Sequence, residues 1–548
     1  MPFWKQSAVR KLLVLGVAPA AIYFVLFCFF TWPWITHFNG WFFTDNGDGL
    51  QNVWNMWWID RSIVDLHQLP WHTSYLHAPF GVTLVGQTLN PINGFVGVLL
   101  QQFMSLTQAF NVMVIFSFVF AGLLMFWLCR YFTKSYTASL VGGAIFTFSS
   151  YHFSHAIGHM QLVSLEFMPL YILLWWQFLR KPGYLLASGS AVTLLLVLFC
   201  DYYYFLYSLI LSAFIAAYLW WRKAIPPLKK PATWRPLALF GVLCLVLVAP
   251  LPLKLLMLNK HEVLVGFHDP RIFSTDLVTP FLDGGFWRFG SLTDWYYRSV
   301  KGFVSETTVY MGLSVIALFA IALWKRSKIH KDIVFWLAVC FFFGIMSLGP
   351  RLLIHGNTIE TIPMPYTIME HLVPGMKLSG VPVRMMVMVT FGSAIIAAMV
   401  LAKVKLDQRR GQLLMATFGL VLLFEMWPTQ LPFTPSAQPR YVQALKTLPN
   451  SGVVLDNAAK SEPEQLLHQA GHERKMILGY VSRIPQSLLD KEAPLVYSIT
   501  LGQYDQLCSK FDVRYIVTPA SRPLQTNFPI VYQDKQAIIY DLKNGPGC

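Results

Sequence analysis

Two stretches near the start of the chain decide the class of fold: LLVLGVAPAAIYFVLFCFFT, Leu12 to Thr31, and TDNGDGLQNVWNMWW, Thr44 to Trp58. The first is 20 residues long and uncharged, which is enough for a helix to cross a hydrocarbon core ~30 Å thick. The second places two carboxylates, Asp45 and Asp48, beside glycines and continues as a tryptophan-rich segment. This order indicates a membrane helix followed by a polar loop at the bilayer surface.

The composition extends this interpretation to the first 430 residues. Hydrophobic residues make up 55% of the chain and charged residues 13%, whereas about 25% of a soluble globular domain is charged. We therefore predict an α-helical polytopic membrane protein with about eleven transmembrane helices. The predicted spans are 12–31, 110–129, 137–151, 162–178, 184–200, 204–221, 236–256, 308–324, 333–348, 386–403 and 411–427.

Lysine and arginine give the orientation of these helices, because basic residues are retained on the cytoplasmic side. With the N-terminus inside, the inner segments carry 20 Lys or Arg, and the outer loops carry nine over more than three times the length. The bias predicts a cytoplasmic N-terminus and an outer C-terminus. It also accounts for the net charge of +15 without a nucleic-acid partner. The inner segments are 1–11, 130–136, 180–183, 222–235, 325–332 and 403–410.

The chain changes character near Pro428, where TQLPFTPSAQPRYVQALKTLPNSG has the composition of a linker. The residues beyond it have an ordinary charge density, and we predict a small α/β domain over 434–548, outside the membrane. Its expected strands are SGVVLDNA, RKMILGY, VRYIVTP and QAIIYDL, and its expected helices are PEQLLHQAG and LGQYDQLCSKF. Cys508 and Cys548 in this domain can pair if the compartment is oxidising.

The outer loop 32–109 has one basic residue, Arg61, but several acids and histidines. Asp48 precedes a predicted interfacial helix, QNVWNMWWIDRSIVDL, whose Trp54, Trp57, Trp58 and Ile59 we expect in the headgroup layer. A second interfacial helix is expected over NPINGFVGVLLQQFMS. From the residues alone two interpretations stay open: Asp48 caps the helix with Asp45 in a turn, or the two acids belong to an active site.

Further segments resemble bacterial GT-C glycosyltransferases of the dolichyl-phosphate-mannose-transferase-like and YfhO-like kind. In that superfamily an Asp or Glu just after the first transmembrane helix serves the acceptor or the catalytic centre, and the donor is a polyprenyl-phosphate-linked sugar. The resemblance implies a GT-C-like membrane module over residues 1–430. It is carried by GDGLQNVWNMWW, YLHAPFGVTL, HFSHAIGHMQLVSLEFMPL, ETTVYMGLSVIAL, SLGPRLL and LVPGMKLSGVPVRMMV.

Applied residue by residue, the resemblance implies that Asp48 is the catalytic acid, because it leads the pattern D-x-x-Q that ends at Gln51. Asp45 is the alternative, since this chain has D-x-x-D where many members have adjacent acids. Glu306 stands immediately before the span 308–324, where the resembled proteins often have an acid that faces the cavity. Glu166 begins the span 162–178, and an acid there is costly unless it also faces a cavity.

Three histidines, His152, His155 and His159, have the spacing of one helix face. Such a cluster can bind a metal, line a wet vestibule or meet lipid headgroups. No cofactor is required by the sequence, and a divalent metal at these residues is an option. Asp201 and the three tyrosines that follow it are most simply an outer turn in an aromatic belt.

A lipid-phosphate donor needs a cation that stabilises the charge of the leaving phosphate. Arg384 and Lys377 precede the span 386–403, and Arg351 follows the span 333–348. Arginine at a water-accessible outer edge runs against the charge bias, which indicates a specific partner. That partner is either the donor phosphate or the headgroup of an ordinary phospholipid.

The resulting hypothesis is a glycosyltransferase of the bacterial inner membrane, with its C-terminal domain in the periplasm. It would move a sugar from a polyprenyl phosphate to a lipid or glycan acceptor on the periplasmic face. Its other expected partners are membrane lipids, and no nucleic-acid partner is expected. One alternative is a flippase or other transporter of lipid-linked glycans, but the spans are nearly free of the buried charges expected there. The other is a non-catalytic protein of envelope assembly.

Overall fold

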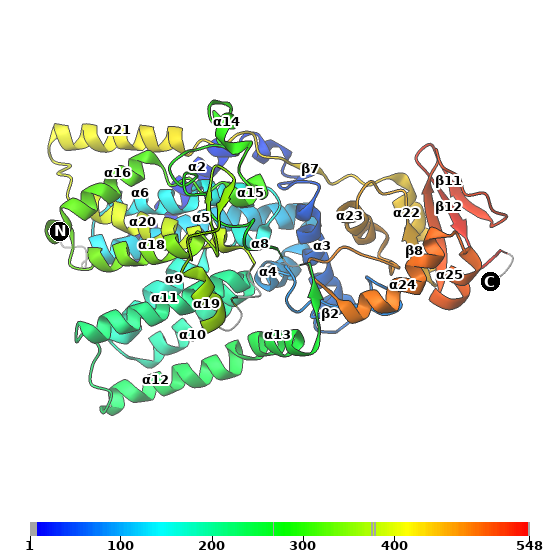
Figure 1. Cartoon of the computed structure of the whole chain (residues 1–548), viewed down its shortest axis with the longest axis horizontal. Coiled ribbons are helices and arrows are strands. Elements are labelled where there is room, and N and C mark those ends of the chain that lie inside the picture. The colour runs from blue at the N-terminus through cyan, green and yellow to red at the C-terminus, as the bar shows by residue number, and fades with distance from the viewer. Residues whose placement is uncertain (1–7, 267, 374–375, 377–379, 546–547) are drawn as a thin grey trace. The chain divides into compact units, whose positions relative to one another are not determined.

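The structure, a computed structural model, describes residues 8–266, 268–373, 376, 380–545 and 548, and most of them are helical (Figure 1). The chain forms two compact units. The first comprises Met1–Thr36, Val112–Pro250 and Phe267–Leu431, and the second comprises His37–Asn111, Leu251–Gly266 and Pro432–Cys548. The second unit thus combines the predicted C-terminal domain with two segments that were assigned to the membrane module. The division into domains at 1–430 and 434–548 stays a prediction.

The first unit is a bundle of helices (Figure 1). Its longer helices are α2 (Ala18–Phe30), α5 (Leu106–Thr133), α6 (Tyr136–Thr147), α9 (Phe167–Arg180), α10 (Tyr184–Cys200), α11 (Tyr202–Trp221), α12 (Pro231–Leu243), α16 (Leu313–Trp324), α18 (Ile333–Ser347), α20 (Met386–Leu401) and α21 (Arg409–Glu425). Shorter elements connect them: α1 (Ala8–Leu12), η2 (Leu13–Val17), η3 (Trp34–His37), α7 (Ser150–His155), α8 (Met160–Val163), η5 (Cys244–Val248), η6 (Gly290–Leu292), α14 (Asp294–Tyr297), α15 (Val304–Thr307), α17 (Arg326–Ile329), the hairpin of β5 (Leu352–Ile354) and β6 (Asn357–Ile359), α19 (Tyr366–Leu372) and η8 (Pro382–Met385).

Helix α20 is the centre of this bundle and packs against α6, α16 and α18 (Figure 1). All 16 of its residues are buried, because MVMVTFGSAIIAAMVL is apolar on every side. Small residues let its neighbours approach closely. A Cβ added to Gly142 of α6 would lie 3.1 Å from the carbonyl oxygen of Ala394 on α20. The sequence of α20 therefore specifies a helix surrounded by others.

Five of the described helical segments are long and apolar enough to cross a membrane, and the chain is accordingly a membrane protein. They are Ala8–Phe30, Leu106–Thr133, Tyr202–Trp221, Pro231–Val248 and Pro382–Leu401. Four shorter apolar helices are Pro91–Gln101, Tyr184–Cys200, Leu313–Trp324 and Ile333–Ser347. The number of eleven crossings stays a prediction.

The second unit contains a four-stranded sheet in the order β11-β12-β10-β8. Its strands are β8 (Val453–Asp456), β10 (Val513–Pro519), β11 (Ile530–Gln533) and β12 (Ala537–Asp541), and only β8 and β10 are parallel. Its helices are α22 (Arg440–Thr447), α23 (Glu462–His472), α24 (Gln486–Thr500) and α25 (Tyr504–Phe511). Three of the four predicted strands therefore exist. RKMILGY does not form a strand of the sheet, and α24 was not predicted.

The remaining elements of the second unit come from the two loop segments. They are β1 (Trp41–Phe42), α3 (Asp48–Asp60), the π-helical turn η4 (Arg61–Asp65), β2 (His72–Thr73), β3 (Val82–Thr83), α4 (Pro91–Gln101), α13 (Pro250–His261) and β4 (Leu264–Val265), together with β7 (Thr434–Pro435) and β9 (Ile484–Pro485). Strand β1 pairs with β7, β2 with β3 and β4 with β9.

Helix α3 differs from the amphipathic interfacial helix that the sequence predicts. Trp54, Trp57, Trp58 and Ile59 are buried in a protein core that also includes Leu466 of α23. The indole N–H of Trp54 donates to Gln469 Oε1 at 2.7 Å, and that of Trp58 donates to the Pro70 carbonyl at 3.1 Å. Buried indoles need such acceptors. The placement of these four residues in the headgroup layer is therefore wrong.

Cys508 and Cys548 form a disulfide across 40 residues. The bond ties α25 to the end of the chain beyond β12. The other five cysteines are free. Disulfides persist in oxidising compartments. The state of this cysteine pair can therefore be used to test on which side of the membrane the unit lies.

Candidate functional site

The acidic loop of the second unit gives Asp45 and Asp48 different roles. Asp45 Oδ1 accepts hydrogen bonds from the backbone N–H of Gly47 at 3.1 Å and of Gly49 at 2.9 Å. These are orphan donors at the start of α3, so Asp45 caps the helix from outside it. Gly49 has no room for a side chain, because an added Cβ would clash with the Thr44 hydroxyl. The interpretation of Asp48 as the cap is therefore wrong.

Asp48 is the first residue of α3, and its carboxylate is turned to a different partner. Its Oδ1 accepts a hydrogen bond from the Tyr480 hydroxyl at 2.6 Å. Gln51, one turn later, accepts at Oε1 from the hydroxyls of Thr88 at 3.1 Å and Ser482 at 3.2 Å. We call these five residues the Asp48 cluster. Burial raises the pKa of the Tyr480 hydroxyl, and its bond to Asp48 raises it further, so Tyr480 stays protonated as the donor.

A buried ion pair joins α15 and η8 in the first unit. Arg384 Nε donates to Glu306 Oε1 at 3.2 Å and Oε2 at 3.1 Å, and its Nη2 also donates to Oε1. Only 6% of Arg384 and 3% of Glu306 is exposed. The guanidinium also lies over the ring of Tyr203, 4.6 Å from its centroid. The predicted position of Arg384 at a water-accessible edge is therefore wrong.

The charge of Glu306 depends on this pairing. Burial alone would raise the pKa of the carboxyl, but the Arg384 guanidinium holds the pKa well below its usual range. Glu306 is therefore an ionised carboxylate inside the protein. A buried pair of this kind is costly to break, because either partner alone is an uncompensated charge.

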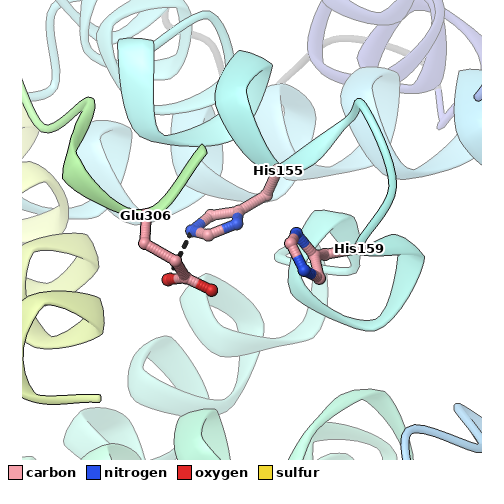
Figure 2. A group of neighbouring side chains, drawn as sticks. All are labelled: His155, His159 and Glu306. Carbon is pink, nitrogen blue, oxygen red and sulfur yellow. Dashed lines mark ion pairs between the residues drawn. The ribbon is translucent and has the colours of Figure 1, made fainter. Parts of the chain in front are cut away.

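Two histidines lie beside Glu306 (Figure 2). His155 is the last residue of α7, and its Nε2 is 3.9 Å from Glu306 Oε2. The His159 ring lies next to it, with centroids 5.5 Å apart. One ligand atom from each of His155, His159 and Glu306 lies within 4.8 Å of the others. Imidazole and carboxylate are ligands that zinc and related divalent ions accept.

His155 has the features of a ligand. It is fully buried, and in the described part of the chain neither of its ring nitrogens has a hydrogen-bond partner. Burial lowers the pKa of His155 well below its ordinary value, although Glu306 opposes the shift. A neutral imidazole keeps a lone pair that can bind a metal ion or accept a proton.

His152 is placed differently from the predicted three-histidine face. Its two ring nitrogens lie against the backbone carbonyls of Thr147 at 2.6 Å and Val163 at 2.8 Å. The helix predicted through these residues is interrupted after His155, and α8 begins at Met160. His152 therefore supports the turn that brings His155 and His159 together, and Glu306 is the third member in its place.

The other predicted residues of the first unit lie elsewhere. Glu166, at the start of α9, is fully buried, and its oxygens have no hydrogen-bond partner among the described residues. Arg351 forms an ion pair with Glu360 at 2.7 Å and is 38% exposed. Lys377 lies outside the described residues. The structure thus gathers His155, His159, Glu306 and Arg384, and it does not bring Arg351 to them.

Two tyrosines of these clusters were not among the predicted site residues. Tyr203 belongs to the turn after Asp201, whose Oδ1 accepts from the Tyr203 N–H at 2.7 Å. The aromatic belt expected there is wrong for Tyr204, which is buried and donates to the Leu162 carbonyl. Tyr480 belongs to RKMILGY, which the pattern assigned to a strand. Nothing in the sequence links either tyrosine to its charged partner.

The chain is a membrane protein, and its fold is similar to that of GT-C glycosyltransferases of known structure. The mycobacterial arabinofuranosyltransferase AftD is similar in structure, with a TM-score of 0.56 at 14% identity over 99% of this chain and 40% of that chain. This chain thus spans less than half of AftD. An apo oligosaccharyltransferase from Archaeoglobus fulgidus has a TM-score of 0.46 at 12% identity, over 94% of this chain and 70% of that chain.

A third structure, ArnT from Cupriavidus metallidurans bound to undecaprenyl phosphate, has a TM-score of 0.42 at 10% identity over 98% of both chains. By sequence, the chain belongs to the family described as "Domain of unknown function (DUF6311)", whose model matches residues 19–426. No curated protein matches the chain.

Proposed function

We propose that this protein is a glycosyltransferase that moves a sugar from a polyprenyl-phosphate donor to an acceptor hydroxyl on the outer face of the membrane. The observation that carries the proposal is Arg384: a guanidinium buried in a GT-C fold, held by Glu306 and Tyr203 and flanked by His155. AftD, which has this fold, is an arabinofuranosyltransferase. The test is transfer of labelled sugar from undecaprenyl phosphate by the purified protein, with Asp48→Asn as the inactive control.

Arg384 is assigned to the donor phosphate. During transfer the bond between the sugar C1 and the phosphate oxygen breaks, and the phosphate leaves with the electron pair. A guanidinium can stabilise that charge through two parallel hydrogen bonds. Tyr203 supports the plane of the guanidinium through a cation–π contact. Glu306 compensates the guanidinium in the structure described, and the incoming phosphate would share Arg384 with it. Lys377 and Arg351 are the secondary candidates for this role.

Asp48 is assigned to the acceptor. The acceptor oxygen attacks the sugar C1 and loses its proton, which a carboxylate within hydrogen-bond reach can take. Asp48 is suited to this because its carboxylate is ordered by the hydrogen bond that it accepts from the Tyr480 hydroxyl at 2.6 Å. Asp45 is assigned to the structure of the loop, since its Oδ1 caps α3.

A divalent metal fits His155, His159 and Glu306. The fit rests on the two ring nitrogens of His155, which have no hydrogen-bond partner in the described residues although the ring is buried. A bound metal would supply Lewis-acid stabilisation of phosphate oxygens. Glu306 would have to divide its two oxygens between the metal and Arg384.

We expect wild-type protein purified without chelator to hold about one divalent ion per chain, because three ligands of suitable type converge. His155→Ala should lose that ion, whereas His371→Ala, at an exposed histidine of α19, should keep it. Elemental analysis by mass spectrometry measures the content. Equal metal content in wild type and His155→Ala would contradict this site.

The topology is tested by the cysteines. An outer, oxidising location of the second unit predicts that five thiols of the denatured protein react before reduction and all seven after it, because Cys508 and Cys548 are joined. Thiol labelling with mass detection counts them. Labelling of single cysteines in intact cells should further place 222–235 and 325–332 inside. Seven reactive thiols without reductant, or 434–548 inside, would contradict the topology.

A further inference from the structure

The segment that carries Tyr480 is held at both ends by backbone hydrogen bonds. The Met476 N–H donates to the Tyr75 carbonyl at 2.8 Å, and the Ala78 N–H donates back to the Met476 carbonyl at 3.0 Å. At the other end, β9 (Ile484–Pro485) pairs with β4. Met476 also forms a single parallel bridge with Val454 of β8, and the Ile477 N–H donates to the Val454 carbonyl at 3.0 Å. The segment is therefore fixed both to the edge of the sheet and to the loop segments of the second unit.

Side chains on either side of Tyr480 add to this anchoring. Gly479 packs so closely that an added Cβ would lie 2.8 Å from Leu76 Cδ2. Val481 is buried in the core that contains the tryptophans of α3. The Arg483 N–H donates to Gln87 Oε1 at 2.9 Å, and its Nη1 donates to the Gly86 carbonyl at 3.1 Å. The segment is therefore positioned without help from the Tyr480 hydroxyl.

The Tyr480 hydroxyl donates its hydrogen bond to the Asp48 carboxylate. Its 2.6 Å bond to Asp48 Oδ1 is charge-assisted, and such bonds are about twice as strong as neutral ones. The acids around this hydroxyl are Asp48, Asp45 from the same loop and Glu462 at the start of α23. In this acidic setting a protonated phenol that donates to a carboxylate stabilises the charged form of that carboxylate.

We infer that Tyr480 is a positioning residue of the transfer reaction: its hydroxyl fixes the Asp48 carboxylate in one orientation and favours its ionised form. The C-terminal part of the chain thus completes the acid site formed by the loop after the first membrane helix. The inference rests on the proposed function, because it takes Asp48 as the base for the acceptor hydroxyl.

The test is Tyr480→Phe, with Tyr532→Phe as a matched control. Tyr532 is in the same unit, and its hydroxyl donates to a different carboxylate, Asp534 Oδ2, at 2.8 Å. We expect Tyr480→Phe to lower kcat roughly 10-fold to 100-fold, the equivalent of one hydrogen bond to a charged group, with little change in the donor KM. Tyr532→Phe should keep the wild-type rate.

The pH profile separates positioning from a merely structural role. A hydrogen bond to the charged form lowers the pKa of a carboxyl, so its removal raises the pKa of Asp48. The acid limb of kcat/KM, below which Asp48 is protonated, should therefore move to higher pH by about one unit in Tyr480→Phe. The Tm should stay close to that of Tyr532→Phe, because the anchors of the segment do not use the hydroxyl.

Two results would overturn the inference while leaving the proposed function intact. One is a wild-type kcat and acid limb in Tyr480→Phe beside an inactive Asp48→Asn. The other is a fall in rate accompanied by a lower Tm and an unmoved acid limb, which would make Tyr480 structural. Full activity in Asp48→Asn would instead remove the base on which the proposed function depends, and this inference with it.

Discussion

Asp48→Asn is expected to reduce the rate of sugar transfer by about 10²–10⁴-fold, the usual contribution of a general base, while the protein stays folded. The amide keeps an oxygen that can accept the Tyr480 hydroxyl bond, so the Asp48 cluster retains its connection to the C-terminal segment. What is lost is the negative charge that takes the acceptor proton. The measurement is transfer by purified protein, together with its thermal stability.

Asp45→Asn is the matched control, because it removes the same charge three residues earlier. Its amide oxygen can still accept from the N–H groups of Gly47 and Gly49, so both rate and stability should stay near wild type. Asp45→Ala loses those bonds and should cost about 1 kcal/mol of stability, as removal of a cap does. An active Asp48→Asn beside an inactive Asp45→Asn would reverse the two assignments.

The second large effect is expected at the buried ion pair. Arg384→Gln and Glu306→Gln should each destabilise the protein by about 3–5 kcal/mol, because each leaves an uncompensated charge inside it. The double variant Arg384→Gln/Glu306→Gln removes both charges and should recover most of that loss. Thermal unfolding in detergent, compared across the four proteins as a double-mutant cycle, measures the coupling.

The transfer rate of the double variant also separates the donor role from stability, provided that its metal content is measured as well, because Glu306 is a proposed metal ligand. If Arg384 holds the donor phosphate, the transfer rate of the double variant should remain about 10²–10³-fold below wild type. Loss of a group that stabilises developing negative charge typically has an effect of this size. Wild-type transfer by a stable double variant would show that the pair serves the fold alone. Lys377 and Arg351 would then be tested for the phosphate.

Much of the membrane character could be predicted from the sequence, because it depends on local composition. The apolar run before Thr31, the acids after it and the fully apolar helix α20 follow from hydrophobicity alone. The strands VRYIVTP and QAIIYDL were also predictable, because short runs rich in β-branched and aromatic residues favour strands. Glu306 was chosen from the resemblance to GT-C proteins, and Arg384 was chosen because an arginine at an outer membrane edge runs against the charge bias and indicates a partner.

The partners themselves could not be predicted, because they are distant in sequence. Glu306 and Arg384 are 78 positions apart, and Asp48 and Tyr480 are 432 apart. The error at α3 has the same origin: its tryptophans have the spacing of an interfacial helix, but Leu466 and Val481 cover them. Periodicity shows that a helix face is apolar, and it does not show whether lipid or another part of the chain covers that face.

The most direct test of the account is transfer from a defined donor. Purified wild-type protein in lipid vesicles would be given undecaprenyl phosphate carrying a labelled hexose, pentose or aminosugar, each in turn. Membranes from a strain lacking the protein would serve as the source of acceptor. We expect that the label from at least one donor moves to a product that no longer carries the polyprenyl chain, and that Asp48→Asn reduces this movement at least about 100-fold. Label that stays on the polyprenyl phosphate with every donor would contradict the proposed transfer reaction, and label that moves equally with Asp48→Asn would contradict the role of Asp48 in it.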